Sequence, residues 1–278
     1  MKKHNREDGV LLRFLYHTSF GRLVLKPLSS RTVSKLCGRF LDSGASKPLI
    51  APFVKKHKID LNDYQCDGFK CFNDFFTRKI KEGLRPIDYD PGALISPCDG
   101  LLSVYNITDG TVIPVKQSCY TVSSLLAGDA AANEYQDGLC LVFRLCVDHY
   151  HRYCHIDDGE VLKSAFISGR LHTVRPIALA EVPVFIENCR EYTVIRTENF
   201  GEIAQIEVGA MLVGKIKNHR GDVNVQRGEE KGMFLYGGST VILLLPHGKA
   251  TLSSKLLNAM ESGEEIPVKM GERIGQAI

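Results

Sequence analysis

YGGSTVILLL, residues 236–245, places two glycines and a Ser-Thr pair directly before a short apolar run. An apolar run bounded by turn residues is typical of a buried β-strand. Further short β-rich runs, separated by Gly, Pro, Asp or Asn, follow residue 92, and they lie at 101–108, 139–147, 161–167, 192–198 and 201–216. This spacing predicts a mainly antiparallel β domain.

The first 85 residues have a helical pattern instead. VLLRFLYHTSFGRLVLKPL (10–28) is apolar and basic, and it predicts an amphipathic helix interrupted at Gly21 and ended by Pro27. CFNDFFTRKIKEG (71–83) predicts a helix that ends near Gly83. The expected fold class is therefore α+β, with a helical segment at 1–85 and a β-rich domain at 86–278.

The charge of the chain is distributed unevenly. The formal net charge is +3, but residues 1–58 carry thirteen Lys/Arg and three Asp/Glu, which gives this part +10. A basic and apolar segment fits an anionic membrane surface, whereas no nucleic-acid motif is recognisable. The alternative is a helix packed on the protein's own core.

Membrane spanning and secretion are not expected from this sequence. No apolar run approaches the roughly 18 to 20 residues that cross a bilayer, and no signal-peptide pattern is present. The nine cysteines are odd in number and lack C-x-x-C spacing, so a reducing compartment fits better than a disulfide framework. Peripheral membrane association is the expectation.

Ser239 is the first candidate for chemistry. A serine that follows glycine on a tight turn can attack the preceding carbonyl through Oγ, which converts the amide to an ester. β-Elimination then leaves dehydroalanine, and hydrolysis gives a pyruvoyl group. The alternative for Gly-Gly-Ser-Thr is an ordinary turn.

The second candidate is VDHYHRYCHIDDG (147–159), in which three histidines and Cys154 are close in sequence. Histidine is the commonest general base near neutral pH. Imidazole and thiolate also bind zinc, but the spacing H-x-H-x-x-C-H matches no standard zinc pattern, so no metal is predicted. Structural roles are the remaining alternative.

The third candidate is Asp99 in ISPCDGLLSVY (95–105). Asp-Gly usually marks only a turn. An aspartate can also orient a histidine and stabilise its imidazolium, as in a serine, histidine and aspartate relay.

Several motifs follow one another in a family's order along most of the chain. They are FNDFFTRKIKEGLRPID (72–88), SPCDG (96–100), YHRYCHIDDG (150–159), GRLHTVRPIAL (169–179), IENCREYTVI (186–195), IAQIEVGAMLVGKI (203–216), RGEEKGMF (227–234) and GGST (237–240). In this combination the chain resembles the phosphatidylserine decarboxylase family.

The resemblance implies autocatalytic cleavage between Gly238 and Ser239. The products are a β chain (1–238) and an α chain (239–278) that begins with a pyruvoyl cofactor derived from Ser239. They are expected to form a heterodimer, with further oligomerisation left open.

The resemblance also implies site residues. Asp99 matches the acid of the family's relay. The family commonly reads Y-H-R-x-H, but here Cys154 occupies the place of the second histidine. His155, one residue later, is slightly preferred as the cleavage base, and His151 is the other candidate as well as a head-group contact.

The implied reaction is decarboxylation of phosphatidylserine. The pyruvoyl group would form a Schiff base with the serine amine and release CO2 and phosphatidylethanolamine, at the cytoplasmic face of the cell membrane. Two alternatives stay open: a pyruvoyl-dependent decarboxylase of a soluble amino acid, and a non-catalytic, metal-binding β protein.

Overall fold

The computed structural model describes residues 10–66, 68–109, 111–115, 118–179, 181–210, 215–219, 223–236 and 239–278. The helices are α1 (Val10–His17), α2 (Ser19–Leu28), α3 (Arg31–Leu41), α4 (Ile50–His57), α5 (Phe72–Phe76), α6 (Val122–Leu125), α7 (Pro176–Leu179), α8 (Val184–Glu187) and α9 (Ser254–Ser262). Short 3-10 helices are η2 (Gly44–Leu49), η3 (Leu61–Asp63) and η4 (Ala130–Tyr135).

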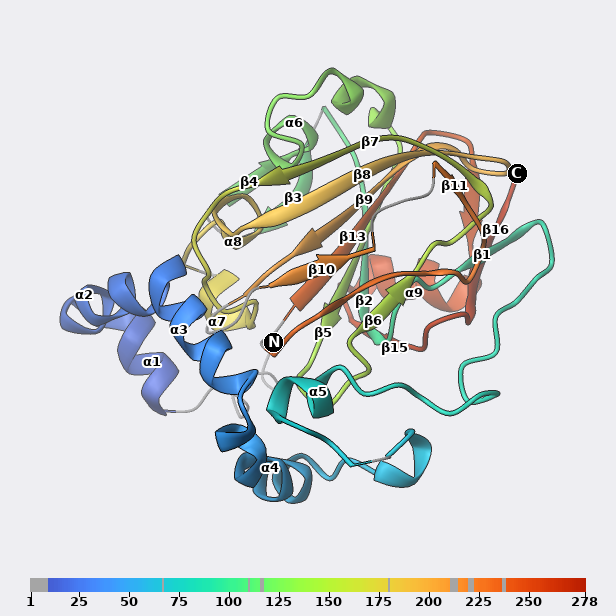
Figure 1. Ribbon diagram of the computed structural model, residues 1–278. Coiled ribbons are helices and arrows are strands. Elements are labelled where there is room, and N and C mark those ends of the chain that lie inside the picture. Colours follow the sequence, from blue (N-terminus) through green and yellow to red (C-terminus); the bar gives the residue numbers. More distant parts are fainter. Residues whose placement is uncertain are drawn as a thin grey trace.

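The strands come after α5 in the chain, and further helices lie between some of them (Figure 1). They are β1 (Ala93–Ile95), β2 (Gly100–Asn106), β3 (Thr111–Val115), β4 (Ser118–Thr121), β5 (Leu139–Leu145), β6 (Arg152–Cys154), β7 (Gly159–Ile167), β8 (Arg190–Thr197), β9 (Gly201–Val208), β10 (Ile216–Asn218), β11 (Asn224–Val225), β12 (Glu230–Phe234), β13 (Ser239–Leu245), β14 (Ala250–Leu252), β15 (Ile266–Val268) and β16 (Arg273–Ala277).

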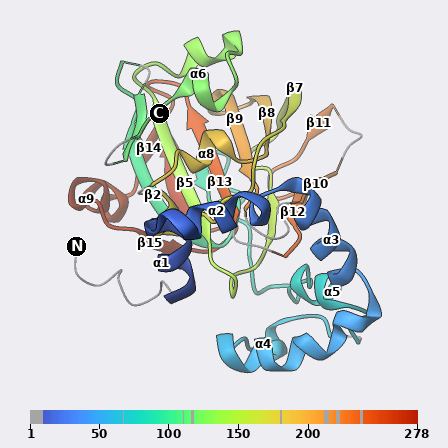
Figure 2. The same cartoon turned by 90° about the vertical axis from the view of Figure 1, so that its left-hand side faces the viewer.

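One eight-stranded sheet organises the β domain. Its order is β11-β7-β8-β9-β13-β5-β2-β15, and every neighbouring pair is antiparallel. A three-stranded sheet, β10-β12-β6, lies beside it, and the helices α1 to α3 gather on one side of the strands (Figures 1 and 2). The α+β prediction is confirmed.

β13 lies in the middle of the large sheet and has a core on each face. Ile242 and Leu244 pack in a cluster with residues of α1, α2 and α8, whereas Val241 and Leu243 pack with residues of β6, β12 and α9. Successive side chains of a strand point to opposite faces, so Ser239 shares the face of Val241. This is the face that β6 and β12 cover.

The N-terminal helix breaks earlier than the sequence predicts. α1 ends at His17, and the Thr18 side chain caps α2 by accepting a hydrogen bond from the Gly21 amide at 2.9 Å. Gly21 lies inside α2, where a Cβ would be only 1.9 Å from the carbonyl oxygen of Phe14 on α1. Pro27 also lies inside α2, in its last turn. The predicted interruption at Gly21 and end at Pro27 are therefore wrong.

The helix predicted for 71–83 is also shorter than expected. α5 ends at Phe76, and Ile80 then pairs with Tyr64 in a β-bridge. Arg78 turns inward, with its guanidinium 4.2 Å from the Tyr64 ring centre and a hydrogen bond to the Asp148 carbonyl oxygen at 3.3 Å. These contacts of Arg78 and Ile80 replace another helical turn.

Candidate active site

Ser239 begins the central strand β13 and faces the interior. Its side chain is 1% exposed, and its Oγ has no hydrogen-bond partner among the described residues. A buried hydroxyl without a partner is costly, and such groups often belong to reactive sites. Gly238, the residue before the predicted cleavage point, lies outside the described residues.

The register of the sheet places Ser239 and Asp99 at the same end. Ser239 pairs with Leu145 on β5, and Leu101 on β2 pairs with Arg144, the residue before Leu145. Ser239 and Gly100 therefore flank Leu145 from its two sides. Asp99 directly precedes Gly100, which sets the SPCDG segment two strands from Ser239.

Asp99 has an arginine as its principal partner. Arg85 donates to the two carboxylate oxygens at 2.7 and 2.5 Å, and the Met270 amide donates to Oδ1 at 3.0 Å. The hydrogen bonds that Arg85 donates to Asp99 raise the pKa of Arg85, although burial opposes this. The two-pronged contact fixes the carboxylate. Arg85 is not predicted from the sequence, because nothing in its local sequence marks it as a partner of Asp99.

His151 has an orientation suited to a general base. Its Nδ1 lies 2.9 Å from the carbonyl oxygen of His149, and because a carbonyl only accepts, Nδ1 must carry the proton. Nε2 therefore holds the free lone pair, and it is buried without a partner in the described part of the chain. Burial, reinforced by the nearby Arg78 charge, lowers the pKa of His151 to about 3.

The surroundings of His151 connect it with the Ser239 segment. Its ring lies 4.1 Å from that of Phe76, which is 5.1 Å from the ring of Tyr236. The His151 carbonyl also accepts from the Phe234 amide at 2.9 Å. Tyr236 is three residues before Ser239, and three residues of extended chain span at most about 11 Å. His151 therefore belongs to the same aromatic cluster as Tyr236.

His155 lies at the other end of β6. It follows His151 by four positions, which is about 13 Å along an extended strand. It lines a polar pocket of about 370 Å³ with Lys231 and Glu191, and its Nδ1 is buried without a described partner. Burial and the Lys231 charge lower its pKa to about 3. The two candidate histidines therefore flank β6 at its opposite ends.

Cys154 occupies the position at which the family commonly has its second histidine. Its amide donates to the Pro97 carbonyl at 2.9 Å, so this position does lie against the SPCDG segment. The side chain is buried, and burial raises the pKa of the thiol to about 12. A thiol held neutral in this way is a poor base at neutral pH.

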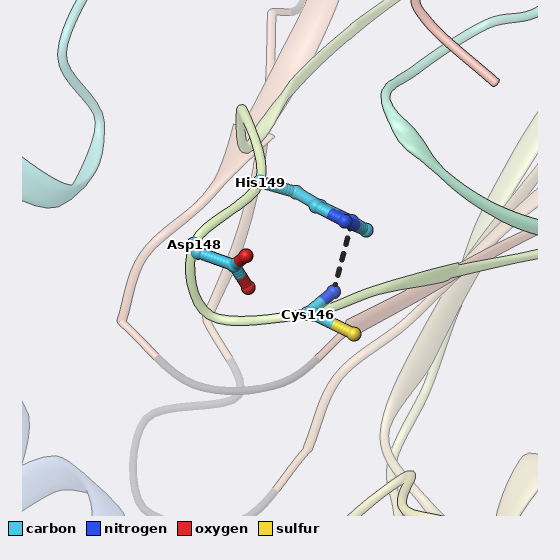
Figure 3. A group of neighbouring side chains, drawn as sticks. All are labelled: Cys146, Asp148 and His149. Atoms are coloured by element: carbon cyan, nitrogen blue, oxygen red, sulfur yellow. Dashed lines mark hydrogen bonds between the residues drawn. The ribbon is translucent and has the colours of Figure 1, made fainter. Parts of the chain in front are cut away.

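His149 lies in the turn after β5 with the opposite tautomer to His151. Its Nδ1 accepts a hydrogen bond from the Cys146 amide at 3.1 Å (Figure 3), so in the neutral ring Nε2 carries the proton. Burial lowers its pKa, while the carboxylates of Asp148 and Asp99 oppose that shift. His149 thus feels the charge of Asp99 and orients His151 through its carbonyl.

A possible metal-ligand set also occurs in this turn. Ligand atoms of Cys146, Asp148 and His149 lie within 4.8 Å of one another (Figure 3). The lone pair of His149 Nδ1 already accepts from the Cys146 amide, so this nitrogen is not available to a metal in this geometry. The absence of a metal from the reaction stays a prediction.

A buried ion pair lies beside Ser239 on the same face of the sheet. Glu207 on β9 is directly opposite Val241, and Lys231 donates to its Oε2 at 2.7 Å. Asn218 donates to the same oxygen at 3.1 Å. Burial raises the pKa of Glu207, although Lys231 opposes this. The sequence did not reveal this pair, because it forms between strands distant in the chain.

Comparison with known proteins gives a consistent result. The profile of the phosphatidylserine decarboxylase family matches residues 72–276. A phosphatidylserine decarboxylase proenzyme 2 of Clostridium acetobutylicum is 47% identical over 266 residues, which cover 95% of this chain and 91% of that protein. A phosphatidylserine decarboxylase proenzyme of Clostridium botulinum (strain Hall) is 40% identical over 270 residues, covering 95% and 92%.

Proposed function

Because this chain belongs to the phosphatidylserine decarboxylase family, we propose that it is a proenzyme that converts its own Ser239 into a pyruvoyl group and then decarboxylates phosphatidylserine. The observation that carries the proposal is the buried Oγ of Ser239, which has no partner among the described residues at the start of β13. The buried Nε2 of His151, likewise without a described partner, supports it. The residues fit the group, because the precursor serine is in place and shielded from water.

The first step is attack of the Ser239 hydroxyl on the Gly238 carbonyl. His151 Nε2 accepts the hydroxyl proton as Oγ bonds to the carbonyl carbon. The C–N bond then breaks, and the nitrogen takes up a proton, so the amide becomes an ester with a free amine on Ser239. A base within hydrogen-bond reach contributes to such a step by about 10²- to 10⁴-fold.

The ester is then eliminated and hydrolysed. Removal of the Ser239 α-proton expels the Gly238 carboxylate and leaves dehydroalanine at the new N-terminus. Its imine tautomer takes up one water and loses one ammonia, which gives the pyruvoyl group. When present, the pyruvoyl carbonyl supplies an electron sink for the loss of CO2 from an α-amino acid.

The base is assigned to His151 rather than to the slightly preferred His155. His151 contacts Phe76 beside Tyr236, three residues from Ser239, whereas His155 faces the pocket of Lys231. Asp99 is assigned as a positioning residue. It is held by Arg85, and its charge opposes the lowering of the pKa of His149. The backbone carbonyl of His149 orients His151.

The N-terminal helices favour a membrane-bound substrate. Phe20 and Leu23 on α2 are 67% and 61% exposed, and Leu36 and Phe40 on α3 are also exposed. The same helices carry Arg22, Lys26, Lys35 and Arg39. No helix in the described residues is long and apolar enough to cross a membrane. The chain is therefore proposed to bind peripherally to an anionic leaflet, the cytoplasmic face of the cell membrane.

The direct test is Ser239→Ala, compared with Ser103→Ala on β2. Ser239→Ala should remain a single chain and should release no CO2 from phosphatidylserine, whereas Ser103→Ala should be processed normally. Decarboxylation by the Ser239→Ala chain would refute the proposal.

A further inference from the structure

A groove with both apolar and basic residues lies between α3 and the β domain. Its volume is about 430 Å³, within the size range of small-ligand pockets. Phe166, Leu171, Ile216 and Leu235 supply apolar surface. Lys35, Arg39 and Lys215 supply positive charge, and Asp42 supplies one negative charge. We refer to it as the α3 groove.

The positive charges of the α3 groove are available to a ligand. Lys35, Arg39 and Lys215 are exposed, and none forms an ion pair with a residue that the structure describes. The Asp42 carboxylate already accepts a hydrogen bond from the Asn73 amide at 2.8 Å. Three cations against one acid leave a surplus of positive charge, which favours an anion such as a phosphodiester.

The inner end of the groove approaches Ser239. Leu235, which lines it, is four residues before Ser239, and its amide donates to the Lys215 carbonyl at 3.1 Å. Cys189 also lines it, and its carbonyl accepts from the Gly209 amide at 2.9 Å. Gly209 follows Val208, which pairs with Thr240, so the groove ends beside the first residues of β13.

The outer end of the groove lies next to the apolar surface of the helices. Lys35 and Arg39 line the groove, while Leu36 and Phe40, one residue further along α3 in each case, are 58% and 48% exposed. Residues four apart share a helix face, so α3 presents one basic face to the groove and a neighbouring apolar one to the surroundings. A lipid could pass along this helix from a membrane into the groove.

We propose that the α3 groove binds one molecule of an anionic glycerophospholipid. The phosphodiester lies on Lys35, Arg39 and Lys215, an acyl chain lies on Phe166, Leu171 and Ile216, and the head group points past Leu235 to Ser239. A soluble phosphate ester would leave the apolar surface uncovered. This inference rests on the proposed function, since the lipid is the substrate of that same site.

The test uses the unprocessed Ser239→Ala chain, so that binding is measured without turnover. The ligand is dihexanoyl-phosphatidylserine below its micelle concentration, with glycerophosphoserine, which lacks acyl chains, as the comparison. Calorimetry should show binding of the dihexanoyl lipid at least about tenfold tighter than of glycerophosphoserine, because burial of each CH2 group is favourable. Equal affinities would overturn the acyl-chain assignment.

Two variants locate the binding. Gly38→Leu fills the groove from α3 and should weaken lipid binding at least about tenfold, while Gly44→Leu adds the same side chain at a position where a Cβ meets only the Lys70 carbonyl, at 3.9 Å. Arg39→Gln with Lys215→Gln changes only exposed side chains and should weaken both ligands. Unchanged binding in Gly38→Leu or in the double variant would overturn the proposal.

Folding and function are checked separately. A Gly38→Leu chain that retains Ser239 should still cleave itself, which reports that it has folded. If the chain with Ser239 intact never cleaves, the proposed function fails, but the binding results with Ser239→Ala still decide on the groove.

Discussion

The Nδ1 of His151 lies 2.9 Å from the carbonyl oxygen of His149, and this contact fixes the tautomer of a buried imidazole. The proton is held on Nδ1, so the lone pair of Nε2 is left free in the interior. In many relays a carboxylate performs this orienting role, whereas here a backbone carbonyl does so. Asp99 pairs with Arg85 instead.

His151→Ala should slow self-cleavage by about 10²- to 10⁴-fold, the usual contribution of a positioned base. His155→Ala is the matched control and should be processed at close to the normal rate. Gel mobility of the denatured chain measures both. Added imidazole should restore cleavage to His151→Ala, because the lost base can be supplied from solution. Normal cleavage in His151→Ala with loss in His155→Ala would reverse the assignment.

Asp99→Asn should slow self-cleavage and also destabilise the protein. Breaking a buried pair by removing one partner costs about 3 kcal/mol, since the Arg85 charge stays behind. If Asp99 works within this pair, Arg85→Gln should slow cleavage comparably, and the double variant should be no slower than either single one. Additive effects of the two changes, or normal processing in Asp99→Asn, would remove the residue from this role.

The stability of the protein should fall in mild acid. The pKa values of His151 and His155 are about 3 in the folded chain against an ordinary 6.5, so the unfolded chain binds more protons between these limits. The stability that depends on these two imidazoles staying neutral is fully present above pH 6.5 and is lost as the pH falls towards 3. Each group should lower the free energy of unfolding by about 1.4 kcal/mol per pH unit.

Denaturant unfolding of the Ser239→Ala chain at several pH values measures this slope. His151→Gln should reduce the slope, because one buried imidazole is removed. His247 is exposed, so His247→Gln should leave it unchanged. An equal slope in all three chains would show that the buried histidines are not responsible.

Phe20→Asn with Leu23→Asn should weaken binding to phosphatidylserine vesicles by about tenfold or more, because two exposed apolar side chains no longer enter the interface. Leu257→Asn is the control, since this exposed residue is on α9, which packs on the other face of the sheet. Vesicle cosedimentation measures the difference. A wild-type chain that does not bind vesicles would instead favour a decarboxylase of a soluble amino acid.

The strands were predictable from the sequence to a greater degree than the helices. The turn residues on either side of an apolar run such as 240–246 mark its ends in the sequence, and β13 occupies Ser239–Leu245. The end of α5 depended instead on Arg78 contacting Tyr64 and Asp148, which are distant in sequence. The break between α1 and α2 depended on close contact of Gly21 with Phe14, which only the folded chain shows.

The sequence alone proposes the candidate site residues, but it does not reveal their contacts. Ser239, Asp99 and the histidines of 147–159 could be identified from chemistry and motif order. The Arg85 partner of Asp99 and the His149 carbonyl behind His151 required the sheet register and the turn after β5. The preference between His151 and His155 reversed for the same reason, since β6 separates them.

Conversion of Ser239 to a pyruvoyl group is tested by the mass of the purified, denatured protein. We expect two chains divided between Gly238 and Ser239, with the smaller one lighter than a serine-started peptide by the mass of one ammonia. A folded protein that remains one intact chain, or a smaller chain that still begins with serine, would contradict it.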